Sequence, residues 1–307
     1  MNTATPSVTI IMRSKNSADT IDQALTSLAA QEFQDFELLV IDSGSTDDTL
    51  EIVQRFEHRL LTVAPEDYFP GPVLNAGANA ANGDLLVFWN SDVVALRPDC
   101  LSLLVAPFQS PQVVASFARQ LPRPHASTWV RRDYAASFPD SPTPPPWLPL
   151  SLPLAAMRRS TWQRRPFYQD AWASEDSEWG HWARRQGLHI AYCPEATVMH
   201  SHNYTLRQLF GRRYVEGEAD AFILSTPPRL SEYLHRYLRS LGSDLLYHLA
   251  HRKFRDLLWS PIGRAVFHGA HFQGRRHGYL RRRQQNPDSL QGQQIALKYH
   301  PSTQRNS

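Results

Sequence analysis

Residues 36–49 have the sequence FELLVIDSGSTDDT, and this stretch decides the fold. An apolar run, Phe36–Ile41, ends at Asp42 and passes through small polar residues into a helix-patterned segment, Asp47–Phe56. Ser45 and Asp48 stand at capping-box spacing before that helix. A strand, a short polar connection and a helix in this order are typical of a β-α-β unit.

Short apolar runs recur on both sides of this stretch, from residue 7 to residue 120. They are Ser7–Arg13, Arg59–Val63, Asp84–Trp89 and Val113–Phe117. A helix-patterned segment, Ala18–Ala30, follows the first run, with Ile21, Leu25 and Leu28 on one face. The alternation predicts a doubly wound α/β domain with a mostly parallel central sheet.

The segment Leu121–Pro153 is rich in proline and breaks this alternation, so we expect a loop there, either a lid over the bound substrates or a surface insertion. Periodicity then resumes as Leu154–Arg158 (extended), Glu175–Gln186 (helical), His189–Val198 (extended) and Leu206–Phe222 (helical). We predict a catalytic domain over residues 1–225, a basic amphipathic helical extension over 226–285 and a disordered tail over 286–307.

The composition is that of an ordinary globular protein of 307 residues, with 42% hydrophobic and 20% charged residues. A net charge of +3 gives no reason to expect nucleic-acid binding. Cys100 and Cys193 stand far apart, which argues against a disulfide framework or a cysteine metal site. No apolar stretch is long enough to cross a bilayer, and no export signal is apparent, so we expect a cytoplasmic protein.

Polar clusters follow three of the expected strands: Arg13–Asn16, Asp42–Asp47 and Asn90–Asp92. Ligands of open α/β sheets bind beyond the carboxyl ends of the strands. Asp42 could accept hydrogen bonds from a nucleoside, or it could cap the following helix. Asp92 could hold a divalent cation against a diphosphate, or it could be a turn residue.

Two later segments carry further candidates. Asp176 lies one turn before Trp179, on the apolar side of a helix, where it could act as a general base or only favour the helix dipole. His200 follows an extended segment and could complete a metal site, although a structural role is equally open.

Taken in this order, the clusters resemble family 2 glycosyltransferases of the GT-A fold over roughly residues 7–222. The fragments that carry the resemblance are Ser7–Asn16, Leu39–Thr49, Gly83–Asp92, Glu175–Asp176 and His200–Tyr204. The segments Tyr68–Gly71 and Arg119–Pro122 are similar to members that build bacterial surface polysaccharides, including rhamnosyltransferases.

The resemblance implies a role for each matched residue. Asp176 would be the catalytic base, Asp92 and His200 would bind Mg²⁺ or Mn²⁺, and His202 with Asn203 would line the acceptor side. The usual Asp-x-Asp motif is here Asn90-Ser91-Asp92, and Leu74 replaces the basic residue that often precedes the matched Asn75. The nucleotide-sugar site would comprise Arg13, Ser14, Asn16, Asp42, Ser43, Asn75, Asn90, Ser91, Asp92 and Glu175.

The implied activity is inverting transfer of a hexose or deoxyhexose from a nucleoside-diphosphate sugar to a saccharide or lipid-linked saccharide acceptor, in the synthesis of a cell-surface polysaccharide or glycolipid. An alternative is a non-catalytic sugar-nucleotide-binding or scaffold protein of a polysaccharide assembly complex. A dinucleotide-dependent dehydrogenase is excluded, because Arg13–Asn16 cannot supply the glycine-rich turn.

The segment 251–283 contains nine Lys and Arg against one Asp, interleaved with aromatic and leucine side chains. This composition suits an anionic membrane surface, which would place the protein peripherally on the inner face of the plasma membrane. It equally suits a solvated helix whose aromatic side chains pack into the protein, and it favours either of these over nucleic acid.

Overall fold

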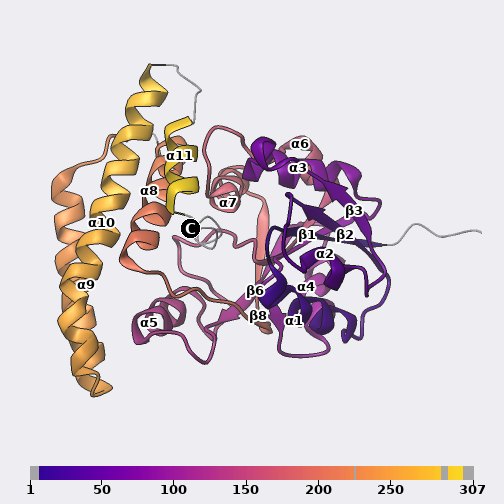
Figure 1. Cartoon of the computed structure of the whole chain (residues 1–307), viewed down its shortest axis with the longest axis horizontal. Helices are drawn as coiled ribbons and strands as arrows, with labels where there is room; N and C mark the ends of the chain where they lie inside the picture. The colour runs from indigo at the N-terminus through magenta and orange to yellow at the C-terminus, as the bar shows by residue number, and fades with distance from the viewer. Residues whose placement is uncertain (1–6, 225, 285–289, 300–307) are drawn as a thin grey trace, which may run out of the picture. The chain divides into compact units, whose positions relative to one another are not determined.

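The computed structural model describes residues 7–224, 226–284 and 290–299 (Figure 1). The chain divides into two compact units. Unit 1 contains the described residues up to Pro124, together with Tyr134–Tyr168 and Glu175–Ser201. Unit 2 contains His125–Asp133, Gln169–Ser174 and the described residues from His202 onward.

Unit 1 is built on one mixed sheet with the order β3-β2-β1-β4-β7-β6-β8-β5 in the described chain. Its strands are β1 (Val8–Ser14), β2 (Phe36–Asp42), β3 (Arg59–Thr62), β4 (Leu85–Trp89), β5 (Val94–Ala95), β6 (Val113–Leu121), β7 (Leu154–Arg158) and β8 (His189–Met199). Strands β3, β2, β1 and β4 are parallel neighbours, as are β6 and β8, whereas β7 runs antiparallel between β4 and β6. The prediction of a mostly parallel α/β sheet is confirmed.

Helices cover both faces of this sheet because its central strands are apolar on both sides. Along β1, Ile10 and Met12 belong to one buried cluster and Ile11 to the other. The first cluster includes residues of α1 (Ala18–Ala29), α2 (Thr49–Val53) and α4 (Cys100–Val105), and the second includes residues of α3 (Pro70–Ala80), α6 (Arg159–Arg164) and α7 (Glu175–Arg185). Short 3-10 turns cover Pro65–Asp67 (η1) and Ala106–Gln109 (η2).

The prediction of a continuous loop over Leu121–Pro153 was wrong in one part. Residues Thr128–Ser137 form a helix, α5, because the prolines flank this stretch and do not interrupt it. The proline-rich residues after α5 belong to unit 1. There Tyr192 Oη donates to the Pro139 carbonyl at 2.8 Å, and Arg184 donates to the Pro146 carbonyl at 2.7 Å.

Unit 2 is helical, with α8 (Leu206–Ile223), α9 (Leu230–Ala250), α10 (Phe254–Arg283) and α11 (Leu290–Tyr299). Helices α8 and α10 pack with their backbones close together, because a Cβ atom at Gly217 would lie 2.1 Å from the His271 carbonyl oxygen and one at Gly274 would lie 1.9 Å from the Tyr214 carbonyl oxygen. Any larger residue at either position would separate the helices. Within unit 2, buried Arg281 lies 3.2 Å from the fully buried Glu218 carboxylate.

Two sequence expectations for the C-terminal part need comment. Helix α8 belongs to unit 2, although we expected the catalytic domain to extend to residue 225. Residues 290–299 form α11 within the segment for which we predicted a disordered tail; residues 286–289 and 300–307 lie outside the described residues. Among the described helices, none has both the length and the apolar character needed to span a membrane.

Candidate active site

Three loops meet at one edge of the unit 1 sheet, because they follow β1, β2 and β4, which are parallel neighbours. The Asn16 N–H donates to Ser45 Oγ at 2.9 Å, and the Thr46 N–H donates to Asn16 Oδ1 at 2.8 Å. Ser91 Oγ donates to Ser17 Oγ at 3.1 Å. The three polar clusters identified in the sequence therefore form one connected surface.

Asp47 joins the first two loops a second time. Its carboxylate accepts hydrogen bonds from the Ala18 N–H at 3.2 Å and from the Thr49 N–H at 3.1 Å, and also from the Thr49 hydroxyl. Burial alone would raise the pKa of Asp47, but these hydrogen bonds outweigh it and hold the pKa below its usual value. A charged Asp47 thus fixes the starts of α1 and α2 relative to each other.

Asp42 ends β2 and is 1% exposed. Its Oδ2 accepts from the N–H groups of Gly44 at 3.0 Å and Ser45 at 2.9 Å, and its Oδ1 accepts from the Ser45 hydroxyl at 2.5 Å. These bonds hold the loop after β2, whereas the N-cap residue of α2 is Asp48, so they are not those of the helix-capping alternative. Two carboxylate oxygens offer about four acceptor positions, so one acceptor position remains for a ligand.

Ser14 and Ser43 lie beside Asp42, where the Ser43 N–H donates to the Ser14 carbonyl at 3.0 Å. Both residues are buried, and within the described residues neither hydroxyl has a hydrogen-bond partner. Buried hydroxyls normally find a partner, so their unused capacity marks this position as one where a ligand or water is expected. Arg13, one residue earlier, is half-buried.

The third loop is a tight turn after β4. The Asn90 N–H donates to the Pro153 carbonyl at 2.9 Å, and the Val93 N–H donates back to the Asn90 carbonyl at 3.0 Å. Arg123 donates to the backbone carbonyl of Asp92 at 2.6 Å. The turn is therefore held through the backbone groups of Asn90, Asp92 and Val93.

The Asp92 carboxylate lies 3.5 Å from His200 Nε2. His200 is buried, and its other ring nitrogen, Nδ1, lies 2.8 Å from Gln120 Oε1. The Gln120 amide is oriented in turn, because its Nε2 donates to Ser151 Oγ at 2.8 Å. In a neutral imidazole, a carbonyl oxygen at Nδ1 favours a proton there and leaves the lone pair on Nε2, the nitrogen that faces Asp92.

Asp176 stands in the first turn of α7 and is half-buried. Its Oδ2 accepts from the Leu152 N–H at 3.1 Å, and its Oδ1 accepts from the Ser177 N–H at 2.7 Å. Glu175, the preceding residue, is buried. The end of the proline-rich segment is therefore attached to the carboxylate that the sequence suggested as a base.

A continuous polar chain connects the two acidic candidates. From Asp92 it passes to His200, then to Gln120 and Ser151. Ser151 is bonded covalently to Leu152, whose N–H donates to Asp176. Residues 92, 120, 151, 176 and 200 all belong to unit 1, so one compact unit contains both carboxylates and the polar network.

Asn75 makes hydrogen bonds within unit 1 through both ends of its side-chain amide. Its Nδ2 donates to the Phe167 carbonyl at 2.8 Å, and its Oδ1 accepts from Trp162 Nε1 at 3.0 Å and the Phe167 N–H at 2.9 Å. Asn75 is buried on α3. These bonds give Asn75 a structural role, and its contact with the nucleotide sugar stays a prediction.

Sequence reasoning did not select Gln120, Ser151 or Arg123. The segment Arg119–Pro122 stood out only through its resemblance to polysaccharide enzymes, which was a usable signal for Gln120. Ser151 carried no signal, because it lies in a proline-rich segment and its partner is 31 residues away in sequence.

Comparison with known proteins identifies the family. Residues 9–171 match the family model described as "Glycosyl transferase family 2". The chain belongs to this family. It is thus a glycosyltransferase, and the resemblance noted from the sequence is confirmed.

Curated relatives of this family 2 glycosyltransferase include two Salmonella proteins. The O-antigen chain rhamnosyltransferase WbaN of Salmonella anatum is 30% identical over 229 residues, which are 69% of this chain and 71% of the relative. RfbN of Salmonella typhimurium, also named an O-antigen chain rhamnosyltransferase, is 28% identical over 223 residues, 68% of this chain and 71% of the relative.

Solved structures show that the fold is that of known glycosyltransferases. The mannosyltransferase PcManGT of Pyrobaculum calidifontis, solved with GDP-Man and Mn²⁺, aligns with a TM-score of 0.58 at 20% identity, covering 98% of this chain and 89% of that chain. S. aureus TarS 1–349 in complex with UDP aligns with a TM-score of 0.53 at 17% identity, covering 91% of this chain and 92% of that chain. At these identities the likeness establishes the fold alone.

Proposed function

We propose that this glycosyltransferase is an inverting enzyme that transfers a hexose or deoxyhexose from a nucleoside-diphosphate sugar to an acceptor hydroxyl, in the synthesis of a cell-surface polysaccharide or glycolipid. The observation that carries the proposal is the polar chain that links Asp92 and His200 to Asp176 within unit 1. The two O-antigen rhamnosyltransferases among the relatives support the polysaccharide setting and a deoxyhexose donor.

The donor would lie along the connected loops at the edge of the sheet. The Asp42 carboxylate oxygen that has room for another hydrogen bond would accept one from an N–H or O–H group of the nucleoside. The Ser14 and Ser43 hydroxyls would form hydrogen bonds with the same part of the ligand. Asn90 and Ser91, in the turn after β4, would face the diphosphate, and Arg13 with Asn16 would complete the surface at the end of β1. Buried Glu175 would stand beside the sugar, next to the base.

Asp92 and His200 would hold the divalent cation, Mg²⁺ or Mn²⁺. A carboxylate oxygen and a neutral imidazole nitrogen are suitable ligands for Mn²⁺, and the bond from His200 Nδ1 to Gln120 is the outer contact that metal-binding histidines usually make. When bound, the cation neutralises charge on the donor's diphosphate. The solved complex of the mannosyltransferase PcManGT with GDP-Man and Mn²⁺ supports the same class of donor and cofactor here.

Asp176 would act as the general base. Its carboxylate takes the proton from the acceptor hydroxyl while the hydroxyl oxygen forms a bond to the anomeric carbon. The bond from that carbon to the diphosphate breaks at the same time, and its electron pair leaves with the nucleoside diphosphate. Attack from the face opposite the leaving group in one displacement inverts the anomeric configuration.

The test measures nucleotide release from UDP-, GDP- and dTDP-sugars, with Mn²⁺ or with EDTA, for the wild type and for Asp176→Asn. We expect one donor class to be hydrolysed only with metal. Asp176→Asn should lower the rate about 10²- to 10⁴-fold while the nucleotide Kd changes less than about threefold. Asp22→Asn is the matched control, because Asp22 is a half-exposed carboxylate on α1 paired with Arg55, and it should keep the wild-type rate.

Ordinary turnover by Asp176→Asn would remove Asp176 from the base role. Once the acceptor is known, proton NMR of the product reports the anomeric configuration, and retention would overturn the inverting mechanism. Binding of every donor without release of nucleotide from any of them, with or without metal, would contradict the proposed transfer from a nucleoside-diphosphate sugar.

A further inference from the structure

The end of unit 2 at which α9 turns into α10 exposes an unusual amount of apolar surface. Phe254, Leu258 and Trp259 are 60%, 78% and 65% exposed at the start of α10, and Leu246 is 71% exposed near the end of α9. Leu245, Leu249 and Ile262 add three more exposed side chains. All seven lie within about 15 Å of the turn along their helices, at 1.5 Å per residue.

The exposed side chains follow the helical repeat. Phe254, Leu258 and Ile262 recur every four residues along α10, on the side away from buried Arg264. On α9, Leu230, Leu234 and Leu238 extend the exposed stripe toward the N-terminus of the helix. A stripe of this kind on a surface helix normally packs against something.

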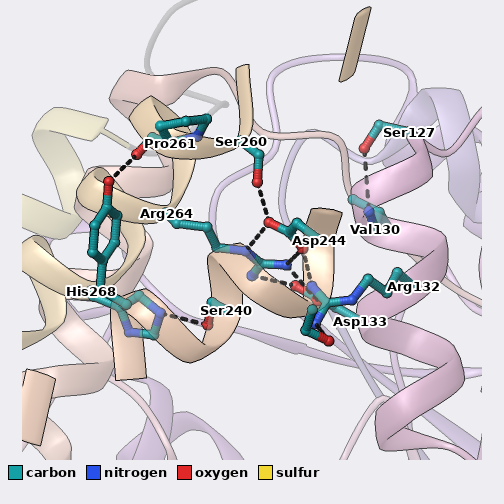
Figure 2. A network of polar contacts seen from close by, with 12 residues as sticks. Ser127, Val130, Arg132, Asp133, Ser240, Asp244, Ser260, Pro261, Arg264 and His268 are labelled. Atoms are coloured by element: carbon teal, nitrogen blue, oxygen red, sulfur yellow. Dashed lines mark hydrogen bonds and ion pairs between the residues drawn. The ribbon is translucent and has the colours of Figure 1, made fainter. Parts of the chain in front are cut away.

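These helices are held firmly, so the exposure is built into the unit. Figure 2 shows the buried Asp244 carboxylate of α9 accepting from Arg264 of α10 at 2.8 and 2.9 Å, with Ser260 as a further donor. Arg264 also pairs with Asp133 at 3.0 Å, and Arg132 pairs with Asp244. The network fixes the side of each helix that faces inward and thereby leaves the apolar stripe outside.

The charges around the turn indicate what covers this surface. Arg252 and Lys253 in the turn are exposed, as are Arg236 and Arg239 on α9. Between Tyr233 and Ile262 the sequence contains two acidic residues, buried Asp244 and half-buried Asp256. A second copy of the chain would bring two such basic turns together, whereas anionic headgroups complement them and the acyl region accepts the apolar side chains.

We propose that the α9–α10 turn, with the exposed residues Leu245, Leu246, Leu249, Phe254, Leu258, Trp259 and Ile262 and the cations Arg252 and Lys253, is a docking surface for an anionic lipid bilayer. The aromatic and leucine side chains enter the interfacial region, and the two cations contact the headgroups. None of these residues belongs to the proposed transfer site, and the membrane proposal does not depend on the proposed function.

The structure bears on the two alternatives that the sequence left open for segment 251–283. Three of its nine cations, Arg264, Arg275 and Arg281, are buried, and Phe267 and Phe272 make ring contacts within unit 2. The part after residue 263 therefore matches the structural alternative. The membrane surface is confined to the turn and the leucines beside it.

The experiment is co-sedimentation of the full chain with vesicles of phosphatidylcholine alone or mixed with phosphatidylglycerol. We expect binding to the mixed vesicles that weakens with salt and little binding to phosphatidylcholine. Leu258→Ser with Trp259→Ser should weaken binding about tenfold or more, because two large apolar side chains no longer enter the bilayer. Arg252→Glu with Lys253→Glu should abolish the preference for anionic vesicles.

The matched controls lie in unit 1: Leu96→Ser, where the leucine is 47% exposed, and Arg55→Glu, where the side chain is 57% exposed. Both should bind vesicles as the wild type does. The proposal would be overturned if the Leu258/Trp259 variant bound vesicles as tightly as the wild type, or if the wild type did not bind them. A wild-type dimer in light scattering that dissociates in this variant would also overturn it. Donor hydrolysis by the same variants should stay at the wild-type rate, so a failed transfer reaction is distinguished from a failed membrane surface.

Discussion

Asn75→Ala separates a structural role for Asn75 from a nucleotide-binding one. The substitution removes the acceptor of Trp162 Nε1 and of the Phe167 N–H, and the donor to the Phe167 carbonyl. Three buried polar groups then lose their partners, each at a cost of about 1–3 kcal/mol. Allowing for partial relaxation, we expect the free energy of unfolding to fall by about 3–5 kcal/mol, and Tm by roughly 10 °C.

The assay is urea and thermal denaturation followed by tryptophan fluorescence, with nucleotide binding measured on the folded variant. Asn82→Ala is the control, because Asn82 is exposed and its amide donates to Glu37 at 2.8 Å, which is worth about 1 kcal/mol or less. We expect the nucleotide Kd of folded Asn75→Ala to stay within about threefold of wild type. Stability within about 1 kcal/mol of wild type together with a clear loss of nucleotide affinity would refute the structural assignment.

Two further predictions concern a positioning residue and a buried imidazole. Gln120→Leu removes the hydrogen-bond acceptor at His200 Nδ1 and should weaken Mn²⁺ binding about 10- to 100-fold, as measured by calorimetry. The control variant Asn82→Ala should bind Mn²⁺ as the wild type does. Equal Mn²⁺ affinity of the two variants would show that Gln120 does not position His200. Burial, together with Arg213, Arg264, His271 and Arg236, lowers the pKa of His268 to about 4. Because the unfolded chain binds the proton more readily, the free energy of unfolding should fall as the pH drops from about 6.5 toward 4. The His268→Gln variant should show a weaker dependence of the free energy of unfolding on pH, measured by urea titrations at each pH. An unchanged dependence on pH would contradict the lowered pKa of His268.

Much of unit 1 could be predicted, because its strands are short apolar runs that end in polar residues. Strand β7 has the predicted bounds, and β2 differs by a single residue. Helix α5 was missed because nearby prolines dominated the pattern, although none lies between Thr128 and Ser137. The local pattern therefore located these two strands and their ends, and it failed for a helix that is flanked by prolines.

The candidate site was predictable where its residues follow strands and not where distant segments meet. The loops after β1, β2 and β4 lie together because parallel neighbouring strands end at one edge. The contacts of Gln120 with Ser151 and His200 join residues 31 and 80 positions apart, and nothing in their local sequence specifies them. Asn75 shows the converse, since its buried environment on α3 could not be inferred from its neighbours in sequence.

The hydrogen bonds among the three loops should affect the rate at which a donor binds and the free-energy cost of ordering its binding surface. Asn16, Ser45 and Asp47 tie these loops together through hydrogen bonds between groups of the chain itself. A donor would therefore meet a preorganised surface and would avoid much of the roughly 0.5–1.5 kcal/mol that ordering each flexible side chain costs. Association should then follow a single fast phase in stopped-flow traces, with no slow conformational step, and loosening Asp47 should introduce one.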